Sequence, residues 1–196
     1  MAMVPRYDAP STDSPAEEIA NAITHLVALG LAIAGLVIMI VEAAPLRDGW
    51  ALFSAIVYGT SLILLFLSST LYHSLKNDRI RRFFLAFDHI AIFLVIAGTY
   101  TPLLLQLQNT WFAAMLGAVV WGGALVGIGI KTLLPGRFDT IAIAAYLLLG
   151  WVGVLAAHAF WQVLPGVTLV LIPLGGLLYS AGVPFYLWER LKFQNA

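Results

Sequence analysis

Long apolar stretches, each able to cross a lipid bilayer, make up most of this 196-residue sequence. A transmembrane helix needs about 20 consecutive apolar residues. Lipid offers no partner for backbone amides, and these runs are about twice the length of a barrel strand, so each is expected to be a helix. The predicted fold is therefore all-α, a polytopic membrane helical bundle. Its six predicted spans are residues 22–44, 50–75, 83–105, 111–133, 140–161 and 164–188.

The composition excludes several classes of protein. Hydrophobic residues make up 61% of the chain and charged residues only 10%, whereas a soluble domain has about 25% charged residues. The formal net charge is zero, so no electrostatic field would attract nucleic acid. The chain has no cysteine, which removes disulfides, thiolate nucleophiles and sulfur-ligated metals. Any metal site must use His, Asp, Glu or water.

The first 16 residues differ from the rest. They are rich in proline and polar residues, with little apolar surface to bury, and are predicted to be a flexible tail. Residues 17–196 are predicted to form one transmembrane domain. The first apolar run is too long for the core of a signal peptide, which has about 7–15 residues, so it is predicted to stay as a permanent span.

The basic residues predict the orientation in the membrane. Nine of the ten Lys and Arg residues fall on one side of the predicted bundle, and only Arg47 falls on the other. The positive-inside rule therefore places the N-terminus and the loops between spans two and three and between four and five in the cytoplasm. The nine are Arg6, Lys76, Arg79, Arg81, Arg82, Lys131, Arg137, Arg190 and Lys192.

The second span has a polar stripe, which is expected to face other helices and not lipid. Its members fall within about 100° of arc at 3.6 residues per turn. They are Ser54, Tyr58, Ser61, Ser68, Ser69 and Tyr72. Glycines and prolines within the spans, including the GxxxG pair Gly123 and Gly127, are interpreted as sites of close helix packing.

Ionisable residues at membrane depth are costly and are therefore functional candidates. His73 lies three residues before Lys76, and Asp88 lies six residues after Arg82, so both are within about 10 Å of the cytoplasmic boundary. His25 joins the same layer from the first span, while His158 is predicted to lie near the outer side. The full set is His25, Glu42, His73, Asp88, His89 and His158.

The residues near the cytoplasmic boundary allow two interpretations. Imidazole is a good zinc ligand, and a carboxylate beside a zinc-bound water can act as a general base. His73 and Asp88 supply one of each, and Ser69, four residues before His73, can support the ring. A catalytic zinc needs three protein ligands. Otherwise these are buried polar residues that tie helix ends together, with Asp88 paired to an arginine at 79, 81 or 82.

Four segments resemble a known family. They are EEIANAITH at 17–25, SSTLYH at 68–73, DHIAIFLVIAGTYTP at 88–102 and GGLLYSAGVPFY at 175–186. Together they resemble the bacterial hemolysin III branch of the progestin and adipoQ receptor (PAQR) family. The resemblance implies seven transmembrane helices, a cytoplasmic N-terminus and a Zn²⁺ ion near the cytoplasmic face.

The resemblance also implies roles for particular residues. His73 matches the family's zinc ligand, Asp88 its aspartate, and Ser69 the serine of the S-x-x-x-H motif. Asn21 and His25 match the first-helix motif, and His25 and His89 are weaker ligand candidates. The family's other two zinc ligands form an H-x-x-x-H on a seventh helix, but no histidine follows His158. Either the sequence is truncated before that helix, which we expect, or this version has lost the helix and with it a full zinc site.

Three functions follow as hypotheses. The first is a zinc-dependent hydrolase-like protein of the bacterial cytoplasmic (inner) membrane, which cleaves an amide or ester of a membrane lipid in lipid homeostasis. The second is a non-enzymatic sensor of membrane state that signals to a partner. The third, suggested by the family's name, is a pore-forming cytolysin, which would need a polar lining through the whole membrane depth.

Overall fold

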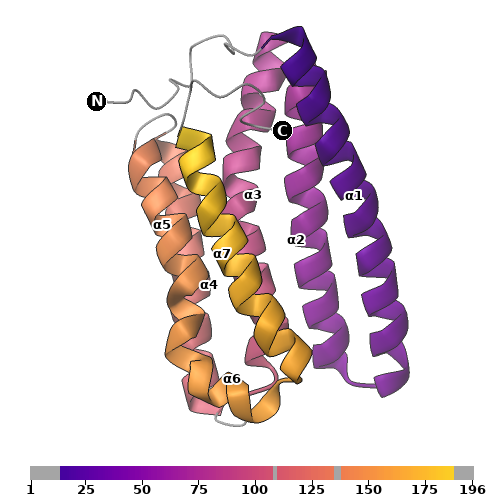
Figure 1. Ribbon diagram of the computed structural model, residues 1–196, viewed down its shortest axis with the longest axis vertical. Coiled ribbons are helices and arrows are strands. Elements are labelled where there is room, and N and C mark those ends of the chain that lie inside the picture. Colours follow the sequence, from indigo (N-terminus) through magenta and orange to yellow (C-terminus); the bar gives the residue numbers. More distant parts are fainter. Residues whose placement is uncertain (1–13, 108–109, 135–137, 188–196) are drawn as a thin grey trace.

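The computed structural model describes residues 14–107, 110–134 and 138–187. Those residues form a bundle of antiparallel helices without a β-strand (Figure 1). The helices are α1 (Pro15–Ala43), α2 (Gly49–Ser74), α3 (Asp78–Leu104), α4 (Thr110–Leu133), α5 (Asp139–Trp151), α6 (Ala157–Val163) and α7 (Gly166–Leu187). Two short 3₁₀ helices, η1 (Ala44–Leu46) and η2 (Val152–Ala156), follow α1 and α5.

Six segments of the described chain are long and apolar enough to cross a membrane, as predicted. Four of them lie within single helices. Residues 15–46 combine α1 with η1, and residues 141–163 combine α5, η2 and α6. The start of α1, the turn between α2 and α3, and the end of α7 lie at one end of the bundle, with α6 at the other (Figure 1). This matches the predicted alternation of the spans, and the first end is the one predicted to be cytoplasmic.

Helix α1 begins earlier than its apolar run. Ser14 accepts a hydrogen bond from the backbone of Glu17, whose carboxylate accepts one from the Ser14 backbone in turn. This reciprocal capping box starts the helix at Pro15, a residue suited to the first helical position. Pro15 and Ala16, predicted to be part of the tail, are therefore helical. The extra turns place Glu18 on a helix face that packs against α2.

The polar stripe of α2 faces the interior, as predicted. Ser54, Ser61, Ser68 and Ser69 are all buried. Helix α2 packs along α1 on one side and along α3 on the other. The hydroxyls of Ser54 and Ser61 donate to carbonyls of their own helix, which satisfies them without a partner across the interface.

The apolar core lies between α3, α4 and α5. Phe93 and Tyr146 pack with ring centroids 4.5 Å apart, next to the fully buried Val120. Gly127 on α4 lies directly against the Phe93 ring, where any side chain would overlap it. Its partner in the GxxxG pair, Gly123, lies against Leu149 of α5 in the same way. The predicted packing role of this pair is confirmed.

A tyrosine from α3 interrupts the fifth span. The Tyr100 hydroxyl donates to the carbonyl of Gly150 and accepts from the backbone N–H of Gly153. Both backbone groups would otherwise belong to the helical ladder, and an inserted side chain is a recognised cause of a helix break. The 3₁₀ helix η2 occupies this point, so the span predicted as one helix is two helices with a tighter segment between them.

Candidate functional site

Three polar residues lie on one face of α1 near the predicted cytoplasmic end. Glu18, Asn21 and His25 are spaced three and four residues apart, so they form one stripe along the helix. Asn21 is 1% exposed, although α1 is mostly exposed to its surroundings. The stripe therefore faces the neighbouring helices.

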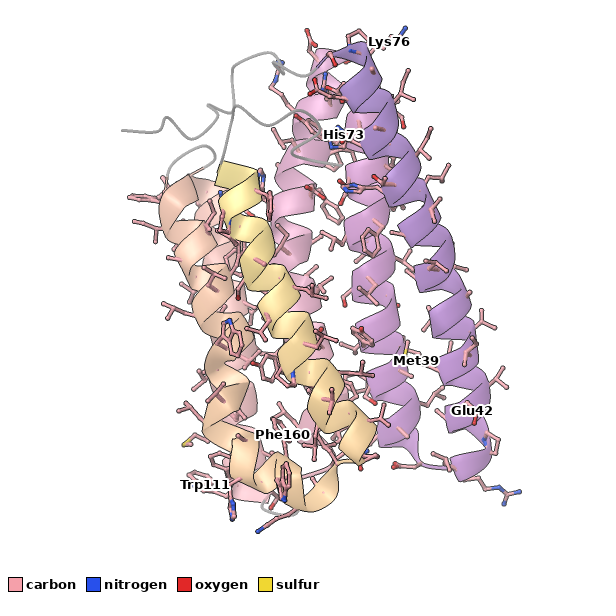
Figure 2. All side chains as sticks on the ribbon, in the orientation of Figure 1. Met39, Glu42, His73, Lys76, Trp111 and Phe160 are labelled. Atoms are coloured by element: carbon pink, nitrogen blue, oxygen red, sulfur yellow. The ribbon has the colours of Figure 1, made fainter. Side chains whose placement is uncertain are left out.

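Glu18 connects His73 of α2 to Arg81 of α3. Its Oε2 lies 2.8 Å from Nδ1 of His73, and its Oε1 accepts from Nη2 of Arg81. The side chains of His73 and Glu18 are only 6% and 16% exposed. The carboxylate thus holds three helices together at the end of the bundle where His73 and Lys76 are labelled in Figure 2.

His25 meets both members of the S-x-x-x-H motif. Its Nδ1 is hydrogen-bonded to the hydroxyl of Ser69, and its ring centroid lies 5.7 Å from that of His73. The sequence suggested that Ser69 would support His73, four residues away on the same helix. In the structure Ser69 bonds to His25 instead, because α1 lies close against this face and Glu18 occupies Nδ1 of His73.

Asp88 is attached to α2 through the consecutive serines Ser68 and Ser69. The hydroxyl of Ser68 lies 3.4 Å from Oδ1 of Asp88 and also donates to the Leu65 carbonyl. The sequence also allowed Asp88 to pair with a nearby arginine. In the structure, Arg81 pairs with Glu18 instead. Asp88 and His73 have different partners, and the consecutive serines connect them to one network.

Asp88 also lines a cavity of about 340 Å³ on the other side of α3. Its walls are mostly apolar residues of α3, α5 and α7, with His89 and Lys131 among the polar ones. Lys131 was counted with the cytoplasmic loop, but it lies in the last turn of α4 and is only 3% exposed. The carboxylate of Asp88 therefore belongs both to the polar network and to the lining of the mostly apolar cavity.

The remaining ionisable candidates have other surroundings than His25 and His73. His89 bonds to the carbonyl of Leu85 in its own helix. His158 is exposed on α6 at the far end and lies 3.2 Å from Gln162. Glu42 is exposed near the same far end (Figure 2). His158 therefore lies at the end of the bundle opposite His73, as expected.

The donor set fits a metal ion only in part. Both His25 and His73 have Nδ1 engaged by an oxygen partner, the pattern in which metal-binding histidines present Nε2. Both polar atoms of the buried Asn21 amide, on the same stripe, lack a hydrogen-bond partner, which is typical of a site that holds water or a ligand. Within the described residues, however, no group of three His, Cys, Asp or Glu side chains can hold a metal.

Sequence reasoning missed Glu18 as part of the site. Glu18 lies before the apolar run of the first span, so the sequence indicated it only as a residue near the boundary of that span. The signal that could have found it is the spacing of Glu18, Asn21 and His25, which places a carboxylate and an imidazole on one helix face.

The chain is similar in sequence to known proteins of one family. Residues 14–195 match the sequence profile of the family described as "Haemolysin-III related". The chain is 40% identical over 180 residues to the "Hemolysin-3 homolog" of Bacillus subtilis (strain 168), covering 92% of this chain and 84% of the relative. It is also 40% identical to "Hemolysin-3" of Bacillus cereus, covering 92% and 82%. No solved structure matches.

Proposed function

This chain belongs to the haemolysin-III related family of multi-pass membrane proteins, and we propose that it is a zinc-dependent, hydrolase-like protein that acts on membrane lipids. Its substrate bond is an amide or ester of a lipid, and its location is the bacterial cytoplasmic membrane. The observation that carries the proposal is a partly buried network at one end of the bundle, which consists of His25, Ser68, Ser69, His73 and Asp88.

Each residue of the network has a task in this proposal. His73, and more weakly His25, would hold zinc through Nε2, because their Nδ1 atoms already have oxygen partners. The ion, when bound, supplies Lewis-acid activation of water and of the scissile carbonyl. Asp88 takes the proton from the attacking water at its carboxylate, and Ser68 orients that carboxylate.

The cavity beside Asp88 is the proposed binding site for the lipid substrate. Its apolar walls from α5 and α7 suit an acyl chain, and Asp88 lies where such a chain would present its polar end. A lipid therefore fits this site better than a soluble substrate.

The test measures zinc and lipid turnover in the same samples. Purified full-length protein, His73→Ala and His158→Ala are analysed for bound zinc and for release of fatty acid from amide-linked and ester-linked lipids in vesicles. His73→Ala should lose both bound zinc and turnover. His158→Ala, altered at the exposed far end, should keep both. Equal zinc content in the wild type and His73→Ala would contradict the proposal.

The alternatives predict other results. A non-enzymatic sensor predicts that an Asp88→Asn protein keeps both its zinc and its signalling in cells. A cytolysin, suggested by the name of the Bacillus cereus relative, predicts ion flux through reconstituted protein. The pore has less support, since Ser54 and Ser61, deep in α2, bond to their own helix and are buried.

A further inference from the structure

We propose that Glu18 is a positioning residue that holds the His73 ring with a protonated Nδ1 directed at the carboxylate and with Nε2 directed away from it. The inference rests on the proposed function in one respect, which is that Nε2 of His73 is the atom that would bind zinc. The orientation of the ring itself is a property of the protein alone.

The hydrogen bond between the two residues determines the tautomer. An ionised carboxylate has only acceptors, so the contact of 2.8 Å from Oε2 of Glu18 to Nδ1 of His73 requires a proton on that nitrogen. In a neutral ring the lone pair must then be on Nε2. Because both side chains are largely shielded from water, water competes little with this bond.

Two further side chains hold Glu18 in place. Arg81 donates to Oε1, so each oxygen of the carboxylate has a different partner. The guanidinium of Arg81 lies over the ring of Tyr72, 4.7 Å from its centroid, and Tyr72 in turn contacts His73 at 4.6 Å between ring centroids. The four residues form a closed ring of contacts across α1, α2 and α3, which fixes the carboxylate.

The neighbouring glutamate offers a matched control. Glu17 is also in the first turn of α1, but its carboxylate accepts from the Ser14 backbone at 2.7 Å. Glutamine serves equally well at this position of a capping box. Glu17→Gln therefore removes one charge from the same turn without altering the bond to His73.

The experiment reads the ring directly. Full-length protein labelled with ¹⁵N-histidine is reconstituted in lipid nanodiscs, and His73 is assigned by its disappearance in His73→Gln. In the wild type and Glu17→Gln, the ¹⁵N shifts should report a proton on Nδ1 of His73. In Glu18→Ala the ring should shift toward protonation at Nε2. An unchanged ring in Glu18→Ala, an equal change in Glu17→Gln, or an Nδ1 without a proton in the wild type would overturn the inference.

Zinc binding gives a second readout. Loss of an outer partner of a metal-binding histidine costs about 10–100-fold in affinity. Glu18→Ala should therefore weaken zinc binding by this factor, with Glu17→Gln unchanged. If the wild type bound no zinc and cleaved no lipid, the proposed function would fail, while the histidine shifts would still decide the role of Glu18.

Discussion

Ser68 of α2 lies 3.4 Å from the carboxylate of Asp88 on α3, while the adjacent Ser69 bonds to His25 on α1. Ser69 also interacts with Asp88, so the two consecutive hydroxyls together join three helices. Because successive side chains on a helix point about 100° apart, a pair of neighbouring serines can serve two interfaces.

The first prediction concerns Asp88 and its partner. Asp88→Asn keeps the size of the side chain but removes the base, so lipid turnover should fall by about 10²–10⁴-fold. Ser68→Ala removes only the supporting hydroxyl and should have a smaller effect. Turnover per bound zinc measures both, so a change in metal content is not counted as a change in chemistry. Equal losses in the two variants would contradict the assignment of Asp88 as the base.

The second prediction concerns the break in the fifth span. Tyr100→Phe leaves the Gly150 carbonyl and the Gly153 N–H without their partner. An unsatisfied buried polar group costs about 1–3 kcal/mol, so the midpoint of thermal unfolding in detergent should fall. Tyr58→Phe is the control, since the Tyr58 hydroxyl has no hydrogen bond to any residue that the structure describes. An unchanged midpoint for Tyr100→Phe would show that η2 does not depend on this hydroxyl.

The third prediction concerns the contact of α4 with the core. Gly127→Ala would place a methyl group inside the space of the Phe93 ring, which is 1% exposed and has little room to move. Overpacking of this kind costs about 1–3 kcal/mol. Gly122→Ala and Gly129→Ala, on the same helix with open space beside them, are the controls. The midpoint of thermal unfolding in detergent should fall for Gly127→Ala and should be unchanged for both controls.

The fourth prediction concerns orientation. The chain has no cysteine, so single cysteines can be introduced without background. Arg47→Cys, beyond the far end of α1, should react with a membrane-impermeant maleimide added to intact cells whose outer barrier is permeable to it. Lys76→Cys, between α2 and α3, should react only after the inner membrane is opened. The reverse pattern would mean that the histidine network lies on the outer side.

The sequence was sufficient to predict the number and order of the spans. Length and hydropathy determine these features, and they act locally along the chain. Span ends were less accurate, since α1 starts at the capping box of Ser14 and Glu17 and not at the first apolar residue. The break after Trp151 was missed, because its cause is the Tyr100 hydroxyl, which belongs to another helix.

The candidate site was predicted in outline only. The depths of His73 and Asp88 followed from their distance to the basic residues, and the two lie on adjacent helices as expected. Their partners did not follow, because the sequence gives no rotation of one helix relative to the next. Glu18 reaches His73 across 55 residues of sequence, and only the packing of α1 on α2 brings them together.

The network around His25 and His73 consists of side chains from α1, α2 and α3 only, the first of them Glu18 and the last Asp88. A chain synthesised from its N-terminus therefore has all of these groups in the membrane before α4 emerges. Until α2 follows, the imidazole of His25 and the amide of Asn21 have no helix to face, and burying them alone is costly. Insertion of the first three spans and assembly of their polar contacts are thus coupled events in the biogenesis of this protein.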